Sequence, residues 1–84
     1  MAAKLSRSGK NAAPPSAAAP TLAEAVRAAR LRHGMTQTEL AGLSGTGLRF
    51  VSELERGKPN VSLSKVVAVL AALGLRLEVR GEAP

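Results

Sequence analysis

Apolar residues recur every three or four positions in four stretches of the chain, and this spacing predicts four helices. The stretches are separated by Gly34, Gly45, a Gly-Lys-Pro turn at 57–59 and Gly74, which end helices or prevent their continuation. A single helical domain over residues 21–74 follows from this pattern. The positions expected to face its core are Leu22, Ala25, Val26 and Ala29 in the first helix, Leu40 and Leu43 in the second, Val51 and Leu54 in the third, and Leu63, Val66, Val67, Leu70 and Leu73 in the fourth.

Two of the predicted helix starts carry a capping box, in which a threonine is followed three residues later by a glutamate. These pairs are Thr21 with Glu24 and Thr36 with Glu39. Each side chain bonds the backbone N–H of the other residue, so the box satisfies donors that the first turn of a helix leaves free. We therefore expect helices to begin at Thr21 and Thr36, and another to begin near Ser62.

The six residues after Gly74 follow a different pattern, because apolar and charged side chains alternate strictly in LRLEVR. Alternation is typical of a β-strand, and the chain has no second strand pattern. A lone strand leaves its backbone groups unpaired, so we expect residues 75–80 to pair with the same strand of a second copy. A register centred on Leu77 sets Arg76 opposite Glu78 of the partner subunit, which favours pairing. The predicted dimer strand contains Leu75, Arg76, Leu77, Glu78 and Val79.

The second and third predicted helices are short and are joined by a turn at Gly45. The third helix carries polar side chains on the side opposite Val51 and Leu54. These residues are Arg49, Ser52, Glu53 and Arg56, with Leu48 at the edge. A short helix, a turn and a second helix with a polar outer face form a helix-turn-helix, which presents side chains to the major groove of DNA.

This segment resembles the Cro/CI-type (xenobiotic response element, XRE) family of helix-turn-helix regulators, and residues 47–75 resemble its HipB-like antitoxin branch. The resemblance covers roughly residues 21–80 and rests on Gln37, Leu40, Ala41, Gly45, Val51, Ser52, Glu55 and Gly57. It implies an all-α fold, a small four-helix lambda-repressor-like domain, in which the C-terminal strand pairs across a homodimer. It also implies double-stranded DNA as ligand and a HipA-type kinase toxin as partner.

Length and charge narrow the class of protein. The chain has 84 residues, no cysteine and a formal net charge of +6. Disulfides and cysteine-based metal sites are therefore excluded. The longest apolar run, residues 66–73, is too short to span a bilayer. No signal-peptide core is evident, so we expect a bacterial cytoplasmic protein that associates with the nucleoid through DNA. The basic excess suits neutralisation of phosphates.

Residues 1–20 consist mainly of Ala, Pro, Ser, Lys and Arg, and we expect them to form a disordered basic arm. Its possible DNA contacts are Lys4, Arg7 and Lys10. Two interpretations stay open, an arm that contacts DNA or toxin and a solvated leader without a role. The expected organisation is this arm, a helix-turn-helix domain over 21–74 and a dimerisation strand over 75–80.

Arg49 is the leading candidate for reading a base, because it lies early on the third helix and its guanidinium matches O6 and N7 of guanine. The alternative is a surface ion pair with Glu53, four residues on. Ser52 lies on the same face, and Glu53 could accept from cytosine but fits better as a partner of Arg49. The family usually has polar residues where this chain has Gly47 and Leu48, so we expect DNA shape or the N-terminal arm to contribute to recognition.

Gln37 resembles the family glutamine that anchors a DNA phosphate from the first turn of the second helix, where free N–H groups also attract anions. The further candidates for phosphate contact are Thr36, Thr46, Arg56 and Lys58. For the two basic residues, the alternative is an ordinary solvated charge. Arg30 and Glu55 match family positions that form an ion pair between the first and third helices, so we expect them to have a structural role.

The chain contains no nucleophile–base set, phosphate loop or metal cluster, so we expect no enzymatic activity, cofactor or metal site. The predicted function is that of a dimeric repressor that binds an inverted-repeat operator and serves as antitoxin and autorepressor of a HipA-type toxin–antitoxin operon. A stand-alone or phage-type repressor without a toxin is the first alternative. A protein-binding module that has lost DNA contact is the second.

Overall fold

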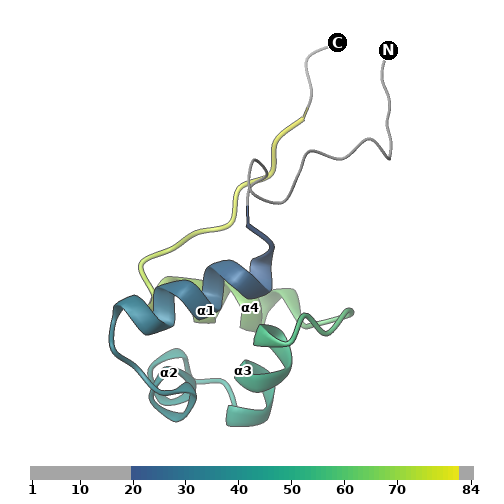
Figure 1. The fold of residues 1–84 in the computed structure, drawn as a ribbon. Coiled ribbons are helices and arrows are strands. Elements are labelled where there is room, and N and C mark those ends of the chain that lie inside the picture. The colour runs from purple at the N-terminus through teal and green to yellow at the C-terminus, as the bar shows by residue number, and fades with distance from the viewer. Residues whose placement is uncertain (1–19, 82–84) are drawn as a thin grey trace.

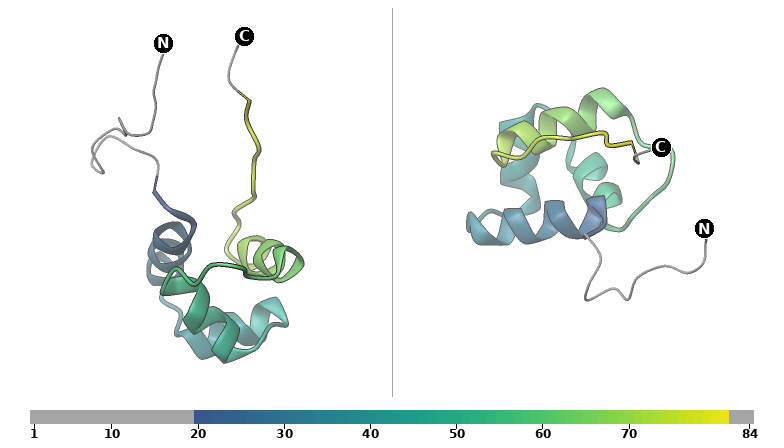
Figure 2. Two further views of the ribbon diagram at one scale, coloured as in Figure 1. Left: turned by 90° about the vertical axis from the view of Figure 1, so that its right-hand side faces the viewer. Right: turned by 90° about the horizontal axis from the view of Figure 1, so that it is seen from above.

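The computed structural model describes residues 20–81, which form four helices and no β-strand. The helices are α1 (Leu22–Arg32), α2 (Gln37–Ser44), α3 (Leu48–Glu55) and α4 (Leu63–Ala72). α2 packs against both α3 and α4, and α1 packs against α3. In Figures 1 and 2, α2 and α3 occupy one end of the domain, and the chain enters and leaves on the opposite side. The predicted four-helix fold is confirmed.

Local hydrogen bonds account for the starts of three helices. Thr21 Oγ1 accepts from the backbone N of Glu24 at 3.1 Å, and the Glu24 carboxylate accepts from the backbone N of Thr21 at 3.0 Å. Thr36 and Glu39 form the same box with distances of 3.0 and 2.8 Å. Ser62 Oγ caps α4 with a longer bond of 3.4 Å. Caps of this kind contribute about 0.5–2 kcal/mol each.

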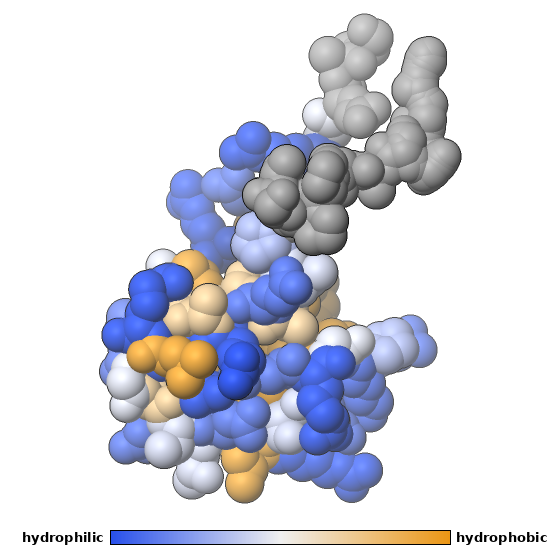
Figure 3. Space-filling model, in the orientation of Figure 1, coloured by the Kyte–Doolittle hydropathy of each residue, from blue (hydrophilic) through white to orange (hydrophobic). Residues whose placement is uncertain are grey.

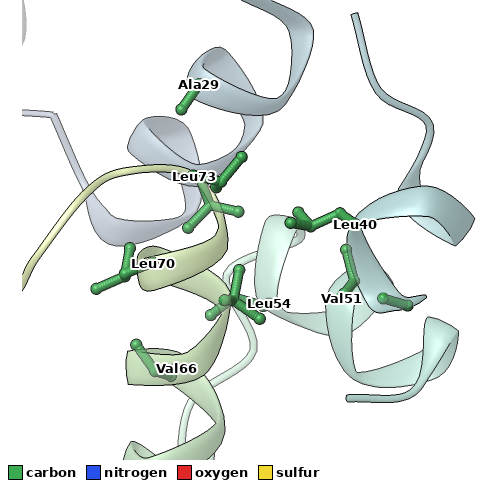
Figure 4. Close-up of a cluster of buried hydrophobic side chains, with 10 residues drawn as sticks. Ala29, Leu40, Val51, Leu54, Val66, Leu70 and Leu73 are labelled. Atoms are coloured by element: carbon green, nitrogen blue, oxygen red, sulfur yellow. The ribbon is translucent and has the colours of Figure 1, made fainter. Parts of the chain in front are cut away.

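The core lies where the four helices meet (Figure 4). Its members are each at most 5% exposed: Val26 and Ala29, Leu40 and Ala41, Val51 and Leu54, and Val66, Val69, Leu70 and Leu73. Full burial of a valine or leucine side chain contributes about 1.5–3 kcal/mol. The position of α3 is therefore fixed largely by Val51 and Leu54, which leave its opposite side free.

Three residues predicted to face the core are exposed instead: Leu43, Leu63 and Val67, at 67%, 63% and 48%. α2 packs against both α3 and α4, and its buried side is centred between Leu40 and Ala41. Leu43 lies about 110° around the helix from that centre, at 100° per residue. On α4 the buried side includes Val69, and Val67 is turned away from it. Helical spacing identifies an apolar side, but its exact direction depends on where the neighbouring helices lie.

Residues 75–81 follow α4 without regular secondary structure and run away from the helices (Figure 1). The backbone N of Leu75 donates to the carbonyl of Leu70 at 2.8 Å, and the Leu75 side chain packs against the core. Beyond it, Leu77 and Val79 are 47% and 94% exposed. Pairing with a second copy requires another chain, so the dimer strand stays a prediction. The predicted arm contacts Lys4, Arg7 and Lys10 lie outside the described residues.

Candidate nucleic-acid interface

The turn between α2 and α3 sets the geometry of the helix-turn-helix. Gly45 has a φ of 71°, a left-handed conformation that costs a residue with a Cβ roughly 1–2 kcal/mol. The backbone N of Thr46 donates to the carbonyl of Ala41 at 3.1 Å. The hydroxyls of Ser44 and Thr46 lie 2.8 Å apart and share a hydrogen bond. Thr46, a predicted phosphate contact, is therefore half-buried and already has a local partner.

α3 begins at an exposed and uncapped end. Its N-cap is Gly47, which forms no side-chain cap. The first N–H groups of a helix carry the positive end of its dipole, so this end favours a negatively charged neighbour. The next residue, Leu48, is 49% exposed. Gly47 and Leu48 therefore offer a backbone edge and an apolar side chain, as the sequence indicated.

The outer face of α3 is polar, and the molecular face drawn in Figure 3 is largely hydrophilic. The side chain of Arg49 is 90% exposed, whereas Val51 on the inner side is fully buried. Ser52 is half-buried and accepts a hydrogen bond from Arg56 Nη1 at 2.9 Å. Arg56 is exposed near the end of the helix. Helical periodicity alone predicted which of these side chains face outward.

Glu53 connects Arg49 with Lys58. Its Oε2 accepts from Arg49 Nε at 3.2 Å, and its Oε1 accepts from Lys58 Nζ at 3.1 Å. These two hydrogen bonds, first that of Lys58 and then that of Arg49, lower the pKa of Glu53 below its ordinary value. The surface ion pair between Arg49 and Glu53, considered above as the alternative to base reading, is thus present. Lys58, a predicted phosphate contact, donates its ammonium hydrogen bond to the Glu53 carboxylate instead.

A charged network joins α1 to α3 behind this face. Arg30 Nε donates to Glu55 Oε2 at 2.7 Å and Arg30 Nη2 donates to Oε1 at 3.0 Å, a two-point contact. The two side chains are only 11% and 4% exposed. Arg30 Nη1 also donates to the carbonyl of Met35 at 2.9 Å, which ties the network to the link between α1 and α2. Hydrogen bonding to Glu55 raises the pKa of Arg30, although burial opposes it.

Gln37 belongs to the same network. Its Nε2 donates to Glu55 Oε1 at 3.1 Å. Burial alone would raise the pKa of Glu55, but the hydrogen bonds from Arg30 and Gln37 outweigh it and lower that pKa. The amide of Gln37 is thus held by the ion pair, and its second N–H has no acceptor among residues 20–81. Thr36, one residue earlier, is exposed and caps α2.

Several of these contacts were not foreseen from the sequence. They are the bonds from Lys58 to Glu53, from Gln37 to Glu55 and from Arg30 to the Met35 carbonyl, together with a 3.2 Å contact between His33 Nε2 and the Leu73 carbonyl. They link residues 5–40 positions apart through the packing of helices or through turns. The bonds from Arg49 to Glu53 and from Arg56 to Ser52 have the four-residue spacing that a helix makes readable, and the first of them was weighed from the sequence.

The described residues also define what the domain lacks. No helix between residues 20 and 81 has the length and apolar character needed to cross a membrane. The same residues contain no group of three or more side chains suited to holding a metal ion. The described residues expose the polar face of α3, which is positioned by the turn at Gly45 and by the ion pair of Arg30 with Glu55. Proteins that read a DNA groove expose a helix in this way.

Comparison with known proteins assigns the family. The helix-turn-helix family model matches residues 26–79. The chain is 44% identical over 54 residues to the uncharacterized HTH-type transcriptional regulator y4mF of Sinorhizobium fredii (strain NBRC 101917 / NGR234), a match that covers 64% of this chain and 71% of the relative. The chain therefore belongs to the helix-turn-helix family of the XRE type, and it is a DNA-binding transcriptional regulator.

Solved structures with the same fold include HipB in the HipA–HipB–O2–O3 complex. The TM-score is 0.65 with 29% sequence identity, and the match covers 74% of this chain and 87% of the matched chain. A structure of a protein named MDT matches with the same values. The resemblance to the HipB-like branch therefore extends from the sequence to the three-dimensional fold.

Proposed function

We propose that this protein is a dimeric, sequence-specific repressor that places one α3 in the major groove at each half of an inverted-repeat operator. The observation that carries the proposal is the outer face of α3, where Arg49 projects with a 90% exposed side chain from a helix anchored by Val51 and Leu54. Arg49 would read guanine through its guanidinium, and Ser52 and Leu48 would contact neighbouring bases or thymine methyl groups.

Phosphate contacts would orient the domain on the duplex. Gln37 lies in the first turn of α2, and its amide is oriented by Glu55 at 3.1 Å. Thr36 and Arg56 are exposed at the edges of the same surface and would add further contacts. Thr46 and Lys58 would contribute only by exchanging a present hydrogen-bond partner for a phosphate. Such contacts fix register and orientation without reading sequence.

The dimer would close through residues 75–80. Leu77 and Val79 are the exposed apolar residues of this segment, and Glu78 lies near both Arg76 and Arg80, at 3.6 and 3.3 Å. Antiparallel pairing centred on Leu77 would replace the contact between Arg76 and Glu78 by pairs of the same two residues between subunits. The segment leaves the domain on the side opposite α2 and α3, so a dimer formed there keeps both α3 helices free (Figure 1).

Gene regulation would be coupled to an antitoxin role. The support is the fold and sequence similarity to HipB, which is solved together with HipA. We propose that this protein holds a HipA-type kinase toxin and represses the operon that encodes both. A stand-alone repressor of the same fold is the alternative, favoured by the similarity to an HTH-type transcriptional regulator without a named partner.

Two experiments test these proposals separately. DNase I footprinting on the DNA upstream of the protein's own gene should reveal an inverted repeat with half-sites about 34 Å apart, or a multiple of that distance, protected on one face. Absence of a protected repeat at low salt would contradict operator binding.

The antitoxin role is tested by co-expression with the product of the adjacent gene, which should yield a complex that binds the same DNA. If the adjacent gene encodes a kinase-like protein that does not co-purify, the antitoxin role is contradicted and the stand-alone repressor is the supported alternative.

The basic residues of the N-terminal segment are proposed to add phosphate contacts. Each such contact contributes nearly one unit to the slope of log binding constant against log salt concentration. Deletion of residues 1–20 should therefore reduce the slope if Lys4, Arg7 and Lys10 touch DNA. An unchanged slope would support a leader without a role in DNA binding.

A further inference from the structure

The two carboxylate oxygens of Glu53 are divided between two cations. Oε2 accepts from Arg49 Nε at 3.2 Å, and Oε1 accepts from Lys58 Nζ at 3.1 Å. The Glu53 side chain is only 18% exposed, whereas Arg49 is 90% and Lys58 is 51% exposed. A carboxylate that is largely covered and has both oxygens occupied is poorly placed to accept from a base itself.

Which nitrogen of Arg49 is bonded to Glu53 matters for recognition of a base. A guanidinium contacts O6 and N7 of guanine with two parallel N–H donors. In this structure Nε is bonded to Glu53, and neither Nη1 nor Nη2 has a partner among residues 20–81. The bond to Nε removes rotational freedom from a long, exposed side chain whose remaining donors are left for DNA. A side chain that is already oriented loses less entropy on binding.

Lys58 fixes the carboxylate in turn. Its backbone N donates to the carbonyl of Glu53 at 3.1 Å. This backbone bond holds Lys58 at the end of α3 independently of its side chain. The ammonium then neutralises the carboxylate, whose pKa is lowered mainly by this hydrogen bond. A neutralised carboxylate reduces the repulsion that a free one would have from nearby DNA phosphates.

We infer that Glu53 is a positioning residue that sets base specificity through Arg49, with Lys58 holding it in place. The inference rests on the proposed function, in which α3 enters the major groove and Arg49 reads guanine. It differs from direct reading of cytosine by Glu53, because Glu53 here acts only through Arg49. It also gives Lys58 a role other than contact with a phosphate.

The test measures preference for guanine at one base pair, in the full-length protein. The operator is first defined by selection from random double-stranded DNA, and the base pair at which Arg49→Ala loses preference is identified. A two-point arginine–guanine contact corresponds to roughly a 5- to 150-fold preference. Glu53→Ala should reduce that preference by roughly two- to fivefold, since ordering of a long side chain is lost. Binding to unrelated DNA should stay the same or become tighter because a negative charge is lost.

Three further variants separate positioning from other roles. Glu53→Gln keeps an oxygen that can accept from Arg49 Nε, so it should retain more of the preference than Glu53→Ala. In the Arg49→Ala background, Glu53→Ala should have no additional effect at this base pair. The control Glu24→Ala removes a carboxylate from α1, outside the helix-turn-helix, and should leave the preference unchanged. Each variant is compared at a temperature well below its measured Tm.

The outcomes distinguish this inference from the proposed function. If Arg49→Ala changes no preference at any base pair, the proposed reading residue is wrong. If Arg49→Ala abolishes the preference but Glu53→Ala leaves it intact, Arg49 reads unaided and the positioning role is overturned. If the effects of the two changes add, or if Glu53→Ala relaxes a different base pair, Glu53 reads DNA directly and the inference is again overturned.

Discussion

Glu55 accepts three hydrogen bonds on one nearly covered carboxylate, two from Arg30 and one from Gln37. It thus joins α1, α2 and α3, and it links a structural ion pair to a residue proposed to touch DNA. Arg49 and Glu53 form a comparable but exposed pair on the outer side of α3. At the scale of single residues, an arginine–glutamate pair is thus covered on one side of α3, and on the other side an exposed pair is proposed to serve recognition.

Removal of either partner of the inner pair should destabilise the domain strongly. Arg30→Ala or Glu55→Ala leaves one buried charge without its partner, which costs about 3–5 kcal/mol. Urea denaturation followed by circular dichroism should show this loss as a lower midpoint with a similar slope. The double replacement Arg30→Met with Glu55→Leu should be less destabilising than either alanine variant. Single variants with a parental midpoint would mean that the pair contributes no stability.

The same pair predicts how stability depends on pH. The folded-state pKa of Glu55 is lowered, so its contribution is present at neutral pH and is lost as the pH falls through that lowered value. Thermal unfolding should therefore show a Tm that drops below about pH 4, where an ordinary glutamate becomes protonated. Glu55→Gln should have a lower Tm at pH 7, and its Tm should fall less steeply as the pH is lowered below about 4. If its Tm falls as steeply as that of the parent protein, other carboxylates cause the loss of stability in acid.

DNA contacts of two kinds are expected to respond differently to replacement. Arg49→Ala should cost roughly 1–3 kcal/mol at one base pair in each half-site and relax the preference there. Gln37→Ala should weaken binding to matched and mismatched operators alike, since phosphate contacts carry no direct base information. Fluorescence anisotropy with a panel of operator variants measures both effects. A Gln37→Ala protein that loses preference at a single base pair would identify Gln37 as a base reader.

At the scale of elements, the helix-turn-helix depends on where each short helix stops. α2 and α3 have eight residues each, too few to be stable alone in water. They are held by Leu40, Val51 and Leu54 in the core and by the turn at Gly45. The left-handed conformation of Gly45 therefore sets the orientation of α3 relative to α2.

Two glycines near this turn give a matched test. Neither Gly42 nor Gly45 has a neighbouring atom within 4 Å of an added Cβ, so substitution there creates no steric clash. Gly45 has a φ of 71°, and Gly45→Ala should cost about 1 kcal/mol through backbone strain. Gly42 lies inside α2, where Gly42→Ala should stabilise by about 0.4–1 kcal/mol. Thermal unfolding should shift the two Tm values in opposite directions, and shifts of the same sign would contradict the assigned turn.

At the scale of the whole molecule, the domain has two opposite ends with different tasks. α2 and α3 form one end, and residues 75–81 leave from the other (Figure 2). The described domain spans residues 20–81, a size at which a single domain is marginal and often gains stability by association. Leu77 and Val79 remain exposed in the single chain, which is consistent with a surface that a second copy covers.

Truncation tests this assignment without disturbing the core. Leu75 packs against the core, so the informative cut lies after Arg76, which removes Leu77 and Val79 and keeps Leu75. The shortened protein should be monomeric at micromolar concentration in sedimentation equilibrium and should bind the operator much more weakly. The exchange Arg76→Glu with Glu78→Arg should preserve dimers better than either single change, because it restores opposite charges across the pair. A truncated protein that still dimerises would place the main interface elsewhere.

Local features of the chain were sufficient to determine most of the fold. The capping boxes at Thr21 and Thr36 and the left-handed turn at Gly45 depend on backbone groups a few residues apart, so their signals lie within short stretches of sequence. The outward direction of Arg49 follows in the same way from its position relative to Val51 and Leu54. The candidate reading residue and the helix boundaries could therefore be predicted from the amino-acid sequence alone.

Tertiary structure decided what depends on neighbours distant in the chain. Ala41 is buried and Leu43 is exposed because α2 packs against both α3 and α4, and periodicity within α2 does not contain this information. The bond from Gln37 to Glu55 likewise spans 18 positions and exists only because α2 packs against α3. Hydrophobic spacing specifies that a helix has an inner side, whereas the direction of that side and the polar contacts at its edges arise from how the helices pack.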